Sequence, residues 1–92
     1  MNQQYATHKK YPLRVPAEIA AEILGCATHD IRILVSKGLL IPLGNPSRSA
    51  VKYFSTVDLL AKASETAWLN KITACLYKHW QQNHANRKQS KD

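Results

Sequence analysis

The topology of this chain is set by residues 15–38, which read VPAEIAAEILGCATHDIRILVSKG. The first half has apolar residues at positions 20, 23 and 24, the i, i+3, i+4 spacing of a helix, and Gly25 is a typical residue to close it. The second half repeats this spacing at positions 31, 34 and 35 and ends at Gly38. Because only Cys26 and Ala27 separate Gly25 from the second run, the two predicted helices cross at a large angle. A helix-turn-helix has this geometry, and so has any αα-corner of a small helical domain.

A β-hairpin is predicted to follow the two helices. Residues 39–41 form a compact apolar run, and residues 51–54 are rich in types that favour strands. Between them, residues 42–50 contain two prolines, a Gly-Asn pair and two serines, which is typical of a loop with its tip near 44–50. Ser55 and Asp58 then have the spacing of a capping box that opens a third helix. The predicted fold class is therefore mainly α with a small β-hairpin, in the order of a winged helix-turn-helix.

A long amphipathic helix is predicted at the C-terminal end, from about residue 66 to 82. Its apolar stripe either packs on the winged domain or pairs with a second copy of the chain, which makes it the candidate oligomerisation surface. The residues of this stripe are Trp68, Leu69, Ile72, Leu76 and Trp80.

Four segments are expected from the composition along the chain. Residues 1–10 are a flexible basic arm, and residues 11–64 are the winged helix-turn-helix domain. Residues 65–82 hold the amphipathic helix, and residues 83–92 are a polar tail that frays into solvent.

The charge balance indicates the class of partner. The 92 residues hold 13 Lys and Arg against 6 Asp and Glu, so the net charge is 13 − 6 = +7, and 45% of the residues are hydrophobic. A core is expected, whereas a membrane span, a secretory signal and a disulfide framework are not. We therefore expect a cytoplasmic, nucleoid-associated protein whose excess positive charge binds a polyanion, double-stranded DNA first.

The second helix, residues 28–37, is the predicted reading helix. Its polar side carries groups that reach base edges or phosphates in a major groove, and an exposed Ile33 would touch a thymine methyl. The alternative is a solvated helix face with one stray apolar residue. The candidate DNA-binding residues of this helix are Thr28, His29, Arg32, Ile33, Ser36 and Lys37.

The predicted wing, residues 42–52, supplies a second candidate contact. Arg48 and Lys52 are its only charges, and no acid occurs from residue 31 to residue 57. Such a wing suits a minor groove or a row of phosphates, and the alternative is a solvated loop with two cations. Arg14 belongs to the basic N-terminal region, which either follows a groove or is simply solvated.

Catalytic and metal chemistry find little support. The four histidines have no carboxylate or nucleophile partner in local spacing, so no catalytic residue and no cofactor is predicted. Cys75 and His79 lie four apart on one helix, but a tetrahedral metal site needs four ligands, so a buried structural Cys75 is the favoured interpretation. Tyr53 and Phe54 are interpreted as core anchors of the wing rather than as a platform for base stacking.

These residues together resemble a known family. The run VPAEIAAEILG at 15–25, the run from Ile31 to Leu40, the Lys52–Ser55 segment KYFS and the pair at 58–59 resemble the winged helix-turn-helix of phage excisionases and the MerR-type DNA-binding head. The resemblance covers residues 15–60. It implies that the reading helix enters the major groove and that the wing around Arg48 contacts the neighbouring minor groove or backbone.

Two positions depart from that pattern, and both bear on the reading helix. The usual capping serine before the helix is Ala27, which moves the expected cap to Thr28, and a polar residue is usual where Ile33 stands. The effector-binding domain of MerR proteins is not expected, so no small-molecule ligand is expected either.

Three function classes follow. The first is a sequence-specific DNA-binding protein, either an excisionase-like architectural factor or a transcriptional regulator, with dimerisation through the C-terminal helix where that stripe is free. The second is a protein-interaction adaptor that uses the winged fold and the apolar stripe at 68–80 as a docking face. The third is a small enzyme, for which the sequence shows no set of catalytic residues.

Overall fold

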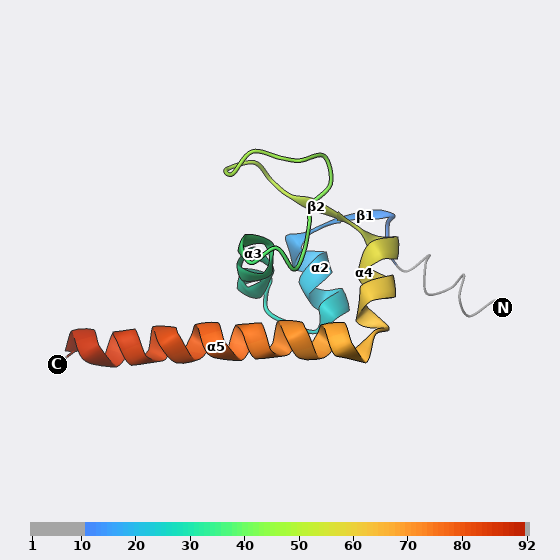
Figure 1. Cartoon of the computed structure of the whole chain (residues 1–92). Helices are drawn as coiled ribbons and strands as arrows, with labels where there is room; N and C mark the ends of the chain where they lie inside the picture. The colour runs from blue at the N-terminus through green and yellow to red at the C-terminus, as the bar shows by residue number, and fades with distance from the viewer. Residues whose placement is uncertain (1–10, 92) are drawn as a thin grey trace.

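The computed structural model describes the backbone of residues 11–91 and the side chains up to residue 82 (Figure 1). The predicted basic arm at 1–10 lies outside the described residues. The prediction of a mainly α fold with a small antiparallel β element is confirmed. The elements in chain order are β1 (Arg14–Pro16), α2 (Ala17–Leu24), α3 (Thr28–Ser36), β2 (Tyr53–Ser55), α4 (Thr56–Ala63) and α5 (Thr66–Lys91).

The joint between α2 and α3 is a tight turn that the backbone itself closes. Gly25 has a left-handed φ of 77°, which a glycine adopts without the steric penalty of a Cβ. The N–H groups of Gly25 and Cys26 both donate to the Ala21 carbonyl, at 2.8 and 3.0 Å. This joint holds α3 at an angle to α2 and leaves one side of α3 outside the core.

The start of α3 is capped from inside the helix. Ala27 is the N-cap residue, and its N–H donates to the Asp30 carboxylate at 3.1 Å. The expected shift of the cap to Thr28 is therefore wrong, and Thr28 is the first residue of the helix. The physical reason is that Asp30, the third residue of the helix, accepts the Ala27 N–H and so makes the half of a capping box that needs no side-chain acceptor at Ala27.

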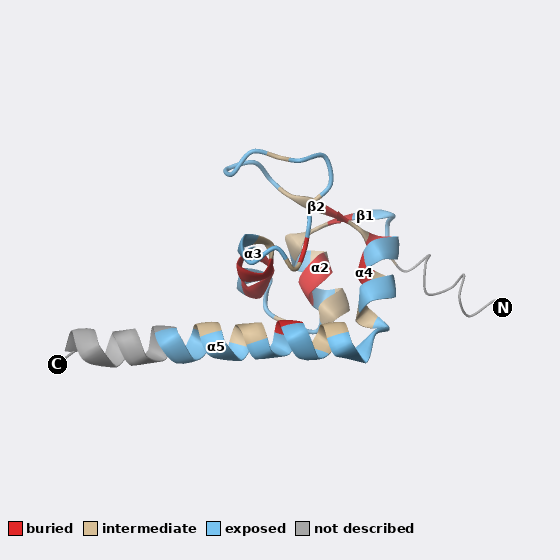
Figure 2. Ribbon diagram, viewed as in Figure 1, coloured by how far each residue is buried: buried red, intermediate tan, exposed pale blue. Residues whose placement is uncertain are grey.

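The hydrophobic core lies where α2, α3, α4, the small sheet and α5 meet (Figure 2). Burial of this apolar surface is the main source of folding free energy, at roughly 25 cal/mol per Å². Leu34 and Phe54 are among its largest fully buried side chains. The buried core residues are Val15, Ala20, Ala21, Ile31, Leu34, Leu40, Phe54, Leu59 and Ile72.

The sheet pairs two segments that are far apart in the sequence. β1 and β2 run antiparallel, with Val15 opposite Phe54. The prediction that residues 39–41 form the partner strand of β2 is wrong. Residues 38 and 39 instead complete the end of α3, because Gly38 N–H donates to the Val35 carbonyl and Leu39 N–H donates to the Leu34 carbonyl. These two bonds form a Schellman motif, and the Leu40 N–H also donates to the Leu34 carbonyl, so the N–H groups of Leu39 and Leu40 are not available to a strand.

Residues 42–52, which we call the wing loop, project from the domain beside α3 (Figure 1). The loop leaves the core after Leu40, whose side chain is buried, and returns at Phe54. A hydrogen bond of 2.8 Å from Leu43 N–H to the Tyr53 carbonyl joins its two arms at the base. The wing is thus a loop whose two arms share a backbone hydrogen bond at the base, rather than a regular hairpin.

The predicted cap of the third helix is confirmed. Ser55 is the N-cap of α4, and its Oγ accepts a hydrogen bond from Asp58 N–H at 3.2 Å. Thr56 follows as a buried residue, and its hydroxyl donates to the Pro12 carbonyl. The start of α4 therefore also fixes the segment that leads into β1.

The last helix, α5, runs along one side of the whole domain and extends past α3 (Figure 1). Its predicted end near residue 82 is wrong, because the helix continues to Lys91, and the last residue of the predicted tail at 83–92 lies outside the described residues. The reason is that residues 66–91 contain neither proline nor glycine, and residues 81–91 are largely types compatible with a helix. No helix in the described part of the chain is long and apolar enough to cross a membrane.

Candidate nucleic-acid interface

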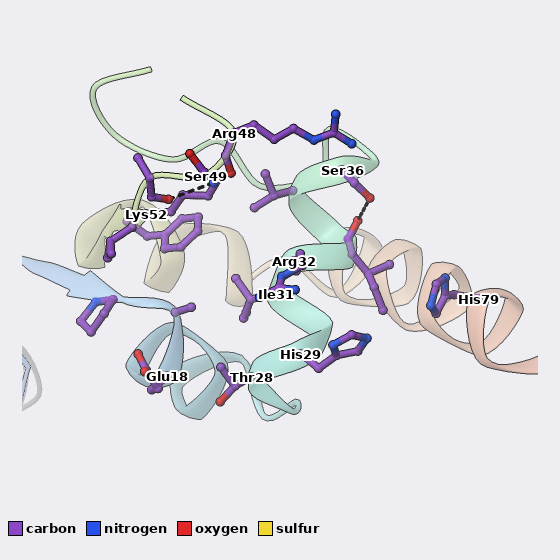
Figure 3. A pocket seen from close by; sticks show the side chains of 17 residues that line it. Glu18, Thr28, His29, Ile31, Arg32, Ser36, Arg48, Ser49, Lys52 and His79 are labelled. Atoms are coloured by element: carbon purple, nitrogen blue, oxygen red, sulfur yellow. Dashed lines mark hydrogen bonds between the residues drawn. The ribbon is translucent and has the colours of Figure 1, made fainter. Parts of the chain in front are cut away.

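A groove with a volume of about 1190 Å³ lies between α3 and the wing loop (Figure 3). One wall is a stripe of α3 in which Thr28, Arg32 and Ser36 follow one another at intervals of four residues. The other wall is the returning arm of the wing loop, residues 48–52. The groove therefore brings two separately predicted candidate sites, the reading helix and the wing, to one surface.

The two arginines of the groove are both available to a ligand. Arg32 and Arg48 are exposed, and the side chain of neither forms a hydrogen bond or ion pair with another residue that the structure describes. In Figure 3, Arg48 extends from the wing loop in the direction of the Ser36 end of α3. Two uncommitted guanidinium groups on opposite walls are well suited to planar or anionic acceptors such as base edges and phosphates.

The two hydroxyl groups of the stripe, on Thr28 and Ser36, differ in how available they are to a ligand. Ser36 Oγ donates to the Ile33 carbonyl at 2.7 Å, so its proton is used within the helix and only its oxygen can accept. Thr28 lies exposed at the start of α3, and its hydroxyl forms no hydrogen bond with another residue that the structure describes. The Thr28 hydroxyl is thus the more available donor of the stripe, because the N–H groups of Ala27 and Asp30 at the helix start are already bonded.

The predicted exposure of Ile33 is wrong. Its side chain is only 6% exposed, so the proposed contact with a thymine methyl lacks an accessible apolar group. The reason is the course of α5, which packs against α3. One turn before Ile33, the His29 ring lies 5.5 Å from the Trp80 ring of α5. His29 is exposed and still borders the groove, but it does so at the edge that α5 covers.

The carboxylate of Asp30 joins α3 to α5, which the sequence did not indicate. Asp30 is buried, with 9% exposure. One of its oxygens accepts a hydrogen bond from Trp80 Nε1 at 3.0 Å, while the other accepts the Ala27 N–H that caps α3. Burial, reinforced by the negative charge of Asp30, raises the pKa of the neighbouring Cys26 thiol. A single buried acid thus fixes where the candidate reading helix starts and how it lies on α5.

The ammonium group of Lys52 is engaged inside the wing loop. It donates to the backbone carbonyls of Ser47, Arg48 and Ala50, at 3.4, 2.8 and 3.1 Å. The sequence predicts Lys52 as a contact to a minor groove or to phosphates, and its spacing gives no sign of this local role. Its positive charge nevertheless remains at the groove, where the charged residues are Arg32, Arg48, Lys52 and the single acid Glu18.

Two other predicted DNA-binding residues are not brought to the groove. Arg14 stands on β1, and its guanidinium carbon lies 4.3 Å from the centre of the Tyr53 ring. Lys37 is exposed just after α3 and is not part of the groove wall. Phe54 is 2% exposed, which confirms its interpretation as a core anchor of the wing.

The apolar stripe of α5 packs on its own domain. Ile72 is 3% exposed, and the half-buried Trp68, Leu69 and Leu76 lie against the same core. Trp80 is 41% exposed but is held by Asp30. Of the two arrangements that the sequence left open for this stripe, the structure has the packed one, so the predicted oligomerisation and docking face is largely covered.

No group of three or more His, Cys, Asp or Glu that suits a metal ion occurs among the residues that the structure describes. Cys26 and Cys75 are both free thiols of intermediate burial, and Cys75 packs on the core.

No family model matches the chain, and neither a curated protein nor a solved structure matches it. The resemblance to excisionases and to the MerR-type head stays a prediction that rests on the quoted residues.

Proposed function

We propose that this protein binds double-stranded DNA with sequence preference, with α3 in the major groove and the wing loop on the adjacent minor groove or backbone. The observation that carries the proposal is that Arg32 of α3 and Arg48 of the wing loop line one groove, both exposed and both uncommitted in the described part of the chain.

The major groove of B-DNA is about 12 Å wide and admits one α-helix. In such a complex, Arg32 donates to the O6 and N7 acceptors of a guanine, which is the commonest specific contact of an arginine. Thr28 and the first turn of α3 then meet a phosphate, which fixes the position of the helix along the duplex. Arg48 enters the minor groove or binds the flanking backbone.

The charge distribution supports the same partner. The net charge of the chain is +7, and residues 31–57, which supply most of the groove, contain no acid. Positive charge gathered in this way attracts any duplex by releasing counterions, before a base is contacted. We propose a role as an excisionase-like architectural factor or a transcriptional regulator in the cytoplasm, at the nucleoid, on the strength of the quoted resemblance.

A protein-interaction adaptor is the less favoured proposal. It required a free apolar stripe on α5, and Ile72 of that stripe is buried in the domain's own core. The large apolar residues that stay exposed on the described part of α5 are Tyr77 at 69% and Trp80 at 41%, and two side chains offer much less apolar area than the whole stripe.

The first experiment is fluorescence anisotropy of the full chain with a labelled random-sequence duplex over a series of salt concentrations. We expect micromolar binding that weakens linearly in a log–log plot, followed by tighter binding to duplexes recovered by site selection. Absence of binding at low salt contradicts the proposal, whereas salt-sensitive binding without any selected sequence leaves only a non-specific DNA-binding protein.

A further inference from the structure

We propose that Lys52 is a positioning residue, which folds the tip of the wing loop so that Arg48 is presented to DNA, rather than a phosphate ligand in its own right. This inference rests on the proposed function. Its geometric basis is that the Lys52 ammonium meets three carbonyls of the same loop, one of which belongs to Arg48 itself.

The number of N–H donors on the ammonium equals the number of carbonyl acceptors around it. A lysine ammonium has three N–H donors, and the carbonyls of Ser47, Arg48 and Ala50 supply three acceptors. The shortest of the three bonds, 2.8 Å, is to the Arg48 carbonyl. A compact point charge suits this cluster, whereas the wide planar guanidinium of an arginine does not.

Little else in the described chain holds the tip. Residues 47–51 are all exposed, so hydrophobic packing does not order them. The backbone bond from Ala50 N–H to the Ser47 carbonyl closes only a local turn, and the bond between Leu43 and Tyr53 lies at the base of the loop. Lys52 is adjacent to β2, so its three bonds tie the exposed tip to the sheet.

Order at this tip matters because Arg48 has no side-chain partner of its own among the described residues. An arginine on a loose loop loses more conformational freedom when it binds, and the affinity falls accordingly. Neutralising Lys52 is therefore expected to weaken DNA binding through Arg48, and to have little effect once Arg48 is absent.

The first test needs no DNA. Backbone ¹⁵N relaxation is measured for the wild type, Lys52→Met, Lys52→Arg and the control Lys71→Met, which removes an exposed lysine from α5. We expect the order parameters of residues 47–50 to fall from about 0.85 to below about 0.6 in both Lys52 variants, and to stay unchanged in the control. Unchanged order parameters in Lys52→Met overturn the inference.

The second test is a double-mutant cycle on a duplex recovered by site selection. We expect Arg48→Ala and Lys52→Met each to weaken binding about 10-fold, and the double variant to remain near 10-fold rather than the roughly 100-fold of independent residues. Lys52→Arg is expected to bind as weakly as Lys52→Met. Additive losses, or full affinity in Lys52→Arg, mean that Lys52 contacts DNA directly and overturn the inference.

The two proposals fail in different ways. If Arg48→Ala binds every duplex as tightly as the wild type, the assignment of the groove as the DNA interface fails and the positioning role fails with it. If Arg48→Ala is weakened and Lys52→Met is not, the DNA interface stands and only the positioning role is overturned.

Discussion

The indole Nε1 of Trp80 donates a hydrogen bond of 3.0 Å to Oδ1 of Asp30, across 50 positions of sequence. The same carboxylate accepts the Ala27 N–H at the start of α3. The C-terminal helix thus contributes directly to holding the candidate reading helix. This relationship, and three features near it, lead to specific expectations.

Replacing Asp30 by alanine is expected to lower the free energy of unfolding by about 1–3 kcal/mol, because two N–H donors in partly buried hydrogen bonds lose their acceptor. Trp80→Phe keeps an aromatic ring but loses the donor, and a smaller loss of about 1 kcal/mol is expected. Urea unfolding followed by circular dichroism measures both. Tyr77→Phe, on an exposed position of the same helix, is the control. Equal stability of Asp30→Ala and wild type contradicts the role of the carboxylate.

Arg32→Ala is expected to weaken binding to a selected duplex by about 1–3 kcal/mol and to relax the preference at one base pair. Its guanidinium is exposed in the groove and has no other described partner, so no change in stability is expected. Anisotropy titrations with the selected duplex and with single-base variants of it give both quantities. Lys71→Ala removes the same charge outside the groove, and a loss equal to that of Arg32→Ala would show that only net charge matters.

Glu18→Gln is expected to strengthen binding to any duplex by a few-fold. Glu18 is exposed and, among the residues that the structure describes, is the one acid that lines the groove, where its negative charge repels the phosphates. Titration against a random-sequence duplex at low and high salt measures the effect, which should shrink as salt screens the charge. Glu22→Gln, on the same helix but outside the groove, is the matched control, and an equal gain in both variants would count against the location of the interface.

Cys26 is expected to react slowly with iodoacetamide below about pH 9, because burial, together with the Asp30 charge, raises its pKa and the thiolate is the reactive form. The rate is measured against pH in a Cys75→Ser background and again in urea. The raised pKa also contributes to stability, because the folded state holds the thiol proton more tightly than the unfolded chain does. This contribution to the free energy of unfolding is fully present below the pKa of Cys26 in the unfolded chain. It is lost as the pH rises through the pKa of Cys26 in the folded state. Identical rates in folded and unfolded protein contradict the shift.

Much of the fold follows from local patterns. The glycines that end α2 and α3, the capping serine at Ser55 and the helical period of residues 17–24 act over a few residues, and each of them is found as predicted. The partner of β2 was not predictable in this way. A strand at 39–41 fits the composition, but the N–H groups of Gly38 and Leu39 close the end of α3, and β2 pairs with residues 14–16 instead.

The candidate site was predictable in part for the same reason. Helical spacing places Thr28, Arg32 and Ser36 on one stripe, and that stripe lines the groove. The burial of Ile33 and the contact of His29 with Trp80 depend on a helix that lies about fifty residues later in the chain. The role of Lys52 depends on the exact path of a loop, which composition alone does not specify.

The wing loop leaves the core after one buried anchor, Leu40, and rejoins it at another, Phe54. Between these two anchors the chain contributes little to the packed interior, and doubling the length of such a loop costs only about 0.6 kcal/mol in closure entropy. Insertions, deletions and wholesale exchange of residues 42–51 are therefore compatible with the same scaffold. The wall formed by the wing loop can therefore vary in sequence and length, while the facing wall of α3 and the stability of the domain stay the same.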